Sequence, residues 1–236
     1  MCDHCVSAAG KTGLSRRGLF AAGAGLALAG ALPAPVRAQS TAVGADEALK
    51  RLVDGNARYV AGTLNERDFS AGRAARAASQ APFASILSCA DSRIAPELAF
   101  DQGPGQLFVT RVAGNFVNED VLASLEYGAQ VLGSQLILVL GHSNCGAVSA
   151  TINVVKEKTQ LPGHLPALIN AIRPAVLAAQ KEGAADLLKA ATIANVRLNV
   201  AKLRKATPIL SQRLAQKQLS VVGGIYDLAT GKVELA

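Results

Sequence analysis

The sequence has few aromatic residues. They make up 4% of its 236 residues, and tryptophan is absent. The formal net charge is +7, but the positive residues are scattered and no aromatic side chains are interleaved with them, which argues against a nucleic-acid-binding surface. Half of the residues are apolar. We therefore expect a globular domain whose core is built from Ala, Leu, Val and Ile.

Long hydrophobic runs are also missing, and the longest apolar segment lies near the start. Arg16 and Arg17 precede an Ala/Gly/Leu-rich run over 19–32, and a small-residue site follows at Ala38. This run is too short to span a bilayer comfortably, so no stable membrane span is expected. The pattern predicts a cleaved twin-arginine export signal over 1–38, recognised by the twin-arginine export machinery, and a periplasmic or secreted protein. The alternative is an uncleaved interfacial anchor.

Cysteine is scarce, with four residues in the chain. Cleavage after residue 38 would remove Cys2 and Cys5, whose role we leave open, and the mature domain over 39–236 would keep Cys89 and Cys145. In an oxidising compartment two thiols can form one disulfide. However, a disulfide has no need of His142, three residues before Cys145, or of a carboxylate two residues after Cys89. A metal site is therefore the favoured interpretation.

Apolar runs alternate with helical periodicity through the mature chain, and this alternation is typical of a mostly parallel α/β sheet flanked by helices. An amphipathic N-terminal helix over 45–61 precedes the first strand. The stretch over 63–82 is polar and is expected to be irregular. The predicted strands cover 83–87, 107–112, 136–140, 219–226 and, at an edge, 233–235. Further helices are predicted over 119–133, 165–182 and 184–205 and from Gly146 onward, with a short helical turn over 96–100.

Two short motifs follow two of these strands. Cys89, Asp91 and Arg93 follow the first strand, and His142 and Cys145 follow the third. Carboxyl ends of parallel strands form the crevice where such folds bind ligands. Two thiolates and an imidazole form a zinc site in which the fourth ligand is either water, which leaves the site catalytic, or the Asp91 carboxylate, which closes it. Asp91 paired with Arg93 would stay ionised and could orient a zinc-bound hydroxide; a buried structural ion pair is the alternative.

The two motifs, C-x-D-x-R and H-x-x-C, resemble those of the β-class carbonic anhydrases. The similarity continues through FDQGPGQLFVTRVAGNFV, SLEYGAQVLG and LILVLGHSNCGAV and extends over 45–236. The resemblance implies one Zn²⁺ per chain bound by Cys89, His142 and Cys145, with Asp91 joining it in a closed state. It also implies reversible hydration of CO2 to bicarbonate by a zinc-bound hydroxide that Asp91 and Arg93 orient. The residues that match substrate-contacting positions of the family are Gln80, Phe108, Ala113, Tyr127 and Gly146.

The resemblance has further consequences. It implies a homodimer or tetramer, in which the helix over 45–61 is an arm that embraces the partner. Members with a regulatory bicarbonate pocket carry Trp where this chain has Ile86, so we expect no such switch, although Arg111 and Tyr127 match the rest of that pocket. Two other functions stay open: hydrolysis of CS2 or COS on the same zinc site, and a bicarbonate- or zinc-binding domain without turnover.

Overall fold

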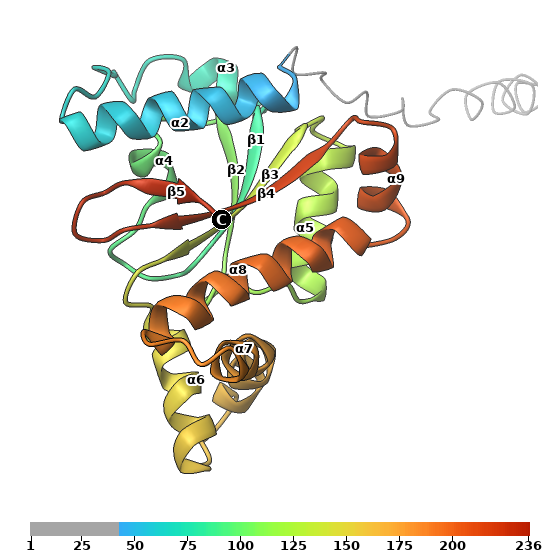
Figure 1. The fold of residues 1–236 in the computed structure, drawn as a ribbon. Coiled ribbons are helices and arrows are strands. Elements are labelled where there is room, and N and C mark those ends of the chain that lie inside the picture. Colours follow the sequence, from blue (N-terminus) through green and yellow to red (C-terminus); the bar gives the residue numbers. More distant parts are fainter. Residues whose placement is uncertain (1–42) are drawn as a thin grey trace, which may run out of the picture. The chain divides into compact units, whose positions relative to one another are not determined.

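A computed structural model describes residues 43–236 of the chain, which are coloured by position in Figure 1. The predicted export signal and the Cys2–Cys5 stretch lie outside the described residues. Within the described residues, no helix is both long enough and apolar enough to cross a bilayer.

A five-stranded sheet with the order β2-β1-β3-β4-β5 forms the centre of this part of the chain. Its first four strands are parallel, and β5 pairs antiparallel to β4 at one edge. The predicted α/β fold with a mostly parallel sheet is therefore confirmed. The strands are β1 (Ala84–Ser88), β2 (Leu107–Arg111), β3 (Leu136–His142), β4 (Ser220–Tyr226) and β5 (Val233–Leu235).

The helices follow the predicted periodicity, with two additions. The short helices α3 and α9 were not expected, since six or seven residues are too few for a clear apolar period. Helix α8 begins three residues later than predicted because the Asp186 side chain accepts a hydrogen bond from the Lys189 N–H and caps it. The helices are α2 (Ala45–Ala61), α3 (Arg73–Ala78), α4 (Pro96–Ala99), α5 (Glu119–Gln130), α6 (Gly146–Glu157), α7 (Leu165–Lys181), α8 (Leu187–Lys205) and α9 (Ile209–Ala215).

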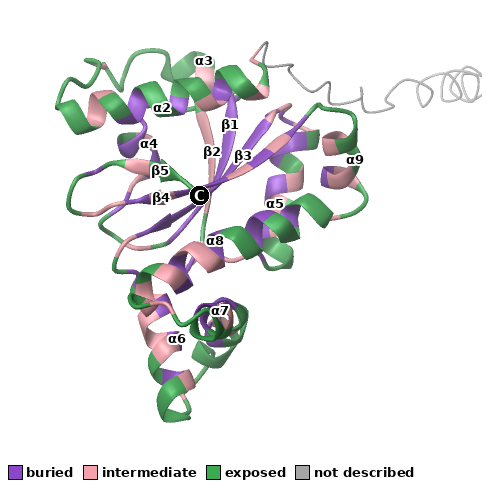
Figure 2. Cartoon of the chain, in the orientation of Figure 1, coloured by how far each residue is buried: buried purple, intermediate pink, exposed green. Residues whose placement is uncertain are grey.

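Each face of the sheet is covered by its own helices. Figure 2 shows that β1 and β3 are buried, whereas the edge strands β2 and β5 are intermediate or exposed. On one face, Leu52 of α2 packs with alternate residues of β1 and β3, including Ile86 and Leu138. On the other face, residues of α5, α8 and α9 pack around Val139. Burying one such side chain stabilises the fold by roughly 1.5–3 kcal/mol. These two layers fix the strands, and hence the positions of the residues at their carboxyl ends.

A third apolar cluster lies beyond those carboxyl ends. It consists of residues of α6, α7 and α8, among them Val148 and Ile172, packed against Cys89 and Cys145. The two thiols thus sit in apolar surroundings, where water is largely excluded.

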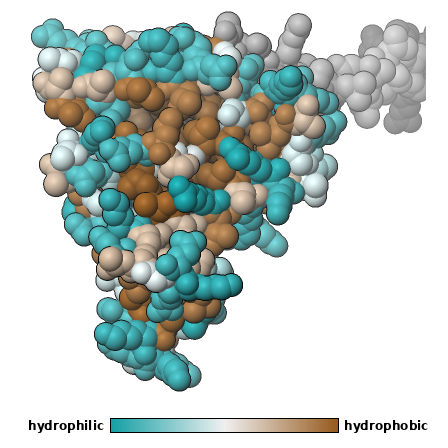
Figure 3. Space-filling view, viewed as in Figure 1, coloured by the Kyte–Doolittle hydropathy of each residue, from teal (hydrophilic) through white to brown (hydrophobic). Residues whose placement is uncertain are grey.

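Apolar side chains are exposed to solvent on one side of the molecule. Figure 3 shows hydrophobic atoms gathered between α2 and α8, over the edge that β5 forms. Val53 and Leu235, which line a small hollow there, are 50% and 55% exposed.

Candidate active site

Two neighbouring strands bring the predicted ligands together. Cys89 directly follows β1, His142 is the last residue of β3, and Cys145 caps the start of α6. Because β1 and β3 pair in parallel, with Ser88 beside Leu140, their carboxyl ends lie side by side. The ligand atoms of Cys89, His142 and Cys145 all lie within 4.8 Å of one another. Both cysteines are free thiols, so the disulfide alternative is wrong.

His142 presents an unpartnered nitrogen in this cluster. Its side chain is fully buried, and Nδ1 lies 2.9 Å from the Ser143 carbonyl oxygen. A carbonyl can only accept, so Nδ1 carries the proton and Nε2 keeps a lone pair. Within residues 43–236, Nε2 has no hydrogen-bond partner, although buried polar atoms are normally satisfied. A buried lone pair beside two thiols fits a metal ion, and the donor set of two sulfurs and one imidazole nitrogen fits zinc.

The Cys89 and Cys145 thiols shift each other's pKa in opposite directions. Its interaction with Cys145, together with the nearby His142 and a bond from the Gly114 N–H, lowers the pKa of the Cys89 thiol to about 4. The hydrogen bond to Cys89, followed by burial, raises the pKa of the Cys145 thiol. Burial disfavours a charged His142, but the neighbouring Cys89 thiol and the Ser143 carbonyl raise the pKa of His142 above the ordinary value. The cluster therefore holds one thiolate and attracts a cation.

Asp91 and Arg93 form a bidentate pair beside the cluster. Arg93 Nε donates to Asp91 Oδ1 at 2.9 Å, and Nη2 donates to Oδ2 at 2.7 Å. The Arg93 backbone N–H adds a bond to Oδ1 at 2.9 Å. The Arg93 guanidinium thereby holds the pKa of the Asp91 carboxyl well below its usual range. The pair reaches the second motif as well, because Arg93 Nη2 donates to the Asn144 carbonyl at 3.2 Å.

Asp91 faces the cluster without joining it. Its Oδ2 lies 3.8 Å from His142 Nε2, while both of its carboxylate oxygens are engaged by Arg93. The side chains of Asp91 and Arg93 are 16% and 53% exposed, so the pair is not buried in the core. Asp91 is thus a neighbour of the three candidate ligands and is paired with Arg93.

Comparison with known proteins agrees with this geometry. The family model for carbonic anhydrase matches residues 84–233. A carbonic anhydrase of Mycolicibacterium smegmatis is 40% identical over 191 residues, covering 80% of this chain and 91% of the relative. A Coccomyxa β-carbonic anhydrase solved with acetazolamide is 33% identical, with a TM-score of 0.62 over 70% of this chain and 77% of that one. The chain belongs to the β-class carbonic anhydrases.

A further structural match concerns the fold alone. One of two Sordaria macrospora β-carbonic anhydrases described as tetrameric aligns with a TM-score of 0.64 at 22% identity, over 70% of this chain and 85% of that chain. As a β-class carbonic anhydrase, this chain catalyses zinc-dependent hydration of CO2, and its Cys-His-Cys cluster fits the zinc ion.

The predicted substrate-contacting residues fall into two groups. Gly146 directly follows Cys145, and Ala113 precedes Gly114, whose N–H donates to Cys89 Sγ at 3.2 Å. The other three lie elsewhere. Phe108 pairs with Ser85, four residues before Cys89, or about 13 Å away along the strand. Its ring packs against Tyr127, which is 45% exposed, with centroids 6.1 Å apart, and Gln80 is exposed ahead of β1.

The buried residues of α8 that hydrogen-bond the backbone next to the site were not predicted from the sequence. Gly114 lies under Asn195, whose Nδ2 donates to the Gly114 carbonyl at 2.8 Å. Asn199, one turn further along α8, accepts from the Val117 N–H at 2.8 Å. Two buried asparagines four residues apart on the inner face of a helix were a signal that could have indicated such a role.

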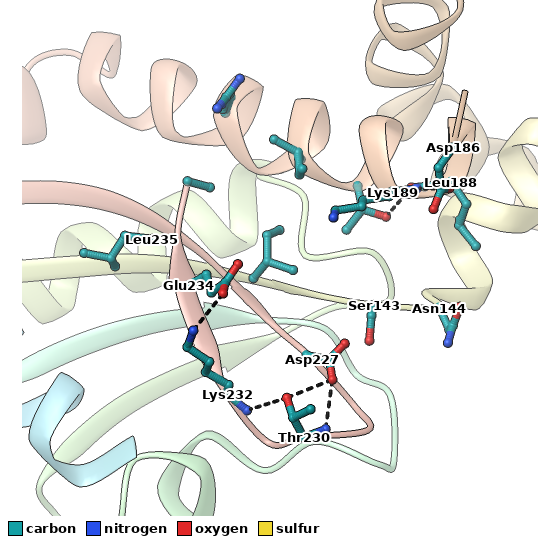
Figure 4. A pocket seen from close by; sticks show the side chains of 15 residues that line it. Ser143, Asn144, Asp186, Leu188, Lys189, Asp227, Thr230, Lys232, Glu234 and Leu235 are labelled. Atoms are coloured by element: carbon teal, nitrogen blue, oxygen red, sulfur yellow. Dashed lines mark hydrogen bonds and ion pairs between the residues drawn. The ribbon is translucent and has the colours of Figure 1, made fainter. Parts of the chain in front are cut away.

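A hollow of about 670 Å³ lies beside the site and is seen in Figure 4 between α8 and the β4–β5 hairpin. It contains Ser143 and Asn144 from the turn between the two ligands but none of the three ligands themselves. Its lysines and carboxylates partly neutralise one another, as in the Lys232–Glu234 ion pair at 2.9 Å. We assign it no part in the chemistry.

Proposed function

We propose that the Asp91–Arg93 pair orients the water molecule that this carbonic anhydrase adds to CO2 to give bicarbonate and a proton. The observation that carries the proposal is the position of Asp91 Oδ2, which lies 3.8 Å from the unpartnered Nε2 of His142. A carboxylate this close to a candidate metal ligand supports the proposal, because it could accept a hydrogen bond from a water molecule held at that site.

Each residue has a separate part in this scheme. Cys89, His142 and Cys145 would hold the zinc ion, which supplies Lewis-acid activation of water at neutral pH. Asp91 is kept ionised by Arg93, so it accepts a hydrogen bond and directs a lone pair of the oxygen nucleophile toward CO2. Arg93, fixed by the Asn144 carbonyl, keeps the carboxylate in place. The apolar cluster around the thiols excludes bulk water from one side of the site.

The proposal is tested by stopped-flow measurement of CO2 hydration on the zinc-loaded protein, with CS2 and COS hydrolysis assayed on the same preparation. Fast CO2 hydration that disappears on zinc removal is the expected result. Faster turnover of CS2 or COS than of CO2 would assign the site to the hydrolase alternative. Bicarbonate binding without any turnover would assign it to the binding domain.

We also propose that the active enzyme is at least a homodimer whose partner completes the substrate pocket. Phe108, Tyr127 and Gln80 lie away from the zinc cluster of their own chain, although they match pocket positions of the family. Phe108 is on β2, which is one of the two edge strands of the sheet, and a second copy can approach there. Exposed apolar side chains on and after the α2 arm, among them Val60 at 47% and Phe69 at 57%, support an interface there.

Replacing Val60 with aspartate is expected to shift the protein toward monomers. Its CO2 hydration activity should then fall in parallel with its molar mass in solution. The cause is a charge placed in the apolar part of the proposed interface. Light scattering and CO2 hydration, both measured across a dilution series, would follow the two effects. Leu177→Asp is the matched control, since Leu177 is 48% exposed but lies on α7. Unchanged mass in Val60→Asp would contradict an interface on this part of the arm.

We further propose that residues 1–38 are a twin-arginine export signal, so that the enzyme acts in the periplasm or outside the cell. Support comes from Arg16-Arg17 ahead of the apolar run and from the small-residue site at Ala38. Changing both arginines to lysine is expected to leave the full-length protein in the cytoplasmic fraction. Immunoblotting of cell fractions measures this effect. Export of the variant at the wild-type level would exclude the twin-arginine route.

A further inference from the structure

Arg111, the last residue of β2, contacts the loop that carries half of the active site. Its Nε donates to the Cys89 carbonyl at 2.9 Å, and its Nη2 donates to the carbonyls of Asp91 at 2.6 Å and Ile94 at 3.0 Å. A single guanidinium thus holds three carbonyl groups of one six-residue loop, here called the Cys89–Ile94 loop. Bonds from a charged donor are stronger than those between neutral groups.

The chain after Arg111 continues the same support. The Val112 N–H donates to the Ser88 carbonyl at 3.1 Å, and the Val112 carbonyl accepts from the Ala90 N–H at 3.3 Å. The Gly114 N–H then donates to Cys89 Sγ at 3.2 Å. Gly114 has φ +82 and touches Ile172 so closely that a Cβ atom would lie 2.4 Å from Cδ1. Residues 111–114 therefore form a fixed cradle under the Cys89–Ile94 loop.

We propose that Arg111 is a positioning residue, which sets the Cys89 thiolate and the Asp91 carboxylate at the distances that zinc binding and catalysis require. Arg111 bonds the main-chain carbonyls of Cys89 and Asp91 rather than the thiolate or the carboxylate, so it acts through the main chain of both residues. The family resemblance would place Arg111 in a bicarbonate pocket, but in this chain two of its nitrogens are committed to main-chain carbonyls. The catalytic part of the inference rests on the proposed role of the Asp91–Arg93 pair, while the part concerning zinc does not.

The test compares Arg111→Met with a matched control, Arg204→Met. Arg204 uses the same two nitrogens, Nε and Nη2, to bond the Val221 carbonyl at 3.1 and 2.7 Å, but at the other side of the sheet, near the start of β4. Zinc-loaded proteins are mixed with a chromogenic chelator to measure the rate of zinc transfer, and kcat and KM for CO2 hydration are measured per bound zinc. Thermal unfolding of both variants reports any general loss of stability.

In Arg111→Met we expect zinc transfer to be faster and kcat to be lower, each by about 10–100-fold, as is typical when support behind a metal ligand is removed. In Arg204→Met both quantities should stay within about twofold of wild type. Arg111→Lys can bond fewer carbonyls, so its zinc-transfer rate and kcat should lie between those of wild type and Arg111→Met. If Arg111→Met does not fold, the test uses Arg111→Lys. Combining Arg111→Met with Asp91→Asn should cost less in kcat than the two separate losses multiplied.

Other results would overturn the inference. If Arg111→Met or Arg111→Lys lowers the unfolding temperature without changing zinc transfer or kcat per zinc, Arg111 has a structural role only. If the variants change inhibition by bicarbonate but not zinc transfer, Arg111 is a ligand-binding residue. If zinc transfer accelerates while kcat losses simply multiply with those of Asp91→Asn, the cradle positions Cys89 alone. That last result would separate a failure of the proposed Asp91 role from a failure of the cradle.

Discussion

Replacing His142 with alanine is expected to remove zinc from the protein and to lower CO2 hydration on the order of 1,000-fold or more. His142 supplies the nitrogen of the Cys-His-Cys cluster, and its Nε2 has no hydrogen-bond partner in the part of the chain that the structure describes. Without the imidazole, two thiols remain in an apolar site, and they cannot complete a tetrahedral zinc site by themselves. Zinc content by mass spectrometry and stopped-flow CO2 hydration on the same sample measure both effects.

His164→Ala is the matched control for this change. His164 lies at the start of α7, its side chain makes no capping hydrogen bond there, and it is exposed. The control should therefore keep full zinc content and wild-type activity. A His142→Ala protein that retained one zinc per chain would show that the imidazole is not a zinc ligand.

The sequence predicted those parts of the molecule that depend on local pattern. The run over 136–140 is continuously apolar, which is typical of a parallel strand covered on both faces, and β3 lies in the middle of the sheet. His142 and Cys89 follow such runs, so their meeting at the carboxyl ends of β3 and β1 was predictable. The period of the helix over 45–61 was clear enough to give both of its ends.

Interactions between distant segments could not be predicted in the same way. The positions of Phe108 and Tyr127 depend on the register between β2 and β1, and register follows from contacts along the whole strand pair. The three carbonyl bonds of Arg111 depend on the path of a loop that no periodicity describes. That path includes backbone shapes such as the left-handed Asn144, at φ 53, between the two ligands of the second motif.

The partner of Asp91 also could not be predicted from the sequence. Spacing placed Asp91 beside both partners, and both are chemically suitable. In this structure Asp91 lies with Arg93, because the Arg93 N–H and guanidinium both donate to the same carboxylate. Such a local turn is favoured by Asp, whose short side chain reaches the N–H two residues on.

Asp91→Asn is expected to lower kcat/KM for CO2 hydration by about 100- to 1,000-fold while zinc content stays near one per chain. An amide carries no charge and has one acceptor oxygen in place of two, so it cannot both bind Arg93 in a bidentate manner and accept a hydrogen bond from the nucleophile. The three atoms that would hold zinc are unaffected, since Asp91 is not one of them. Loss of zinc together with activity would instead make Asp91 a ligand in the resting enzyme.

Asp227→Asn is a control with similar local geometry. Asp227 Oδ1 accepts from the Ala229 N–H at 3.1 Å, two residues on, as Asp91 Oδ1 does from Arg93. Within residues 43–236, however, no arginine forms an ion pair with Asp227. This variant should keep kcat/KM within about twofold of wild type.

The pH dependence separates the Asp91 role further. Arg93 holds the pKa of the Asp91 carboxyl well below its usual range, so the group is already ionised above about pH 4, where an unperturbed carboxyl would still be titrating. Asp91 therefore contributes no inflection to the pH–rate profile over an assay range of about pH 6 to 9. Arg93→Met removes the partner that depresses this pKa, so the ionised fraction of Asp91, and with it kcat, should fall as the pH is lowered toward about 4. Arg93→Lys keeps a positive charge and should show a smaller fall, whereas equal acid sensitivity in wild type and Arg93→Met would contradict the pairing as the cause of the low pKa.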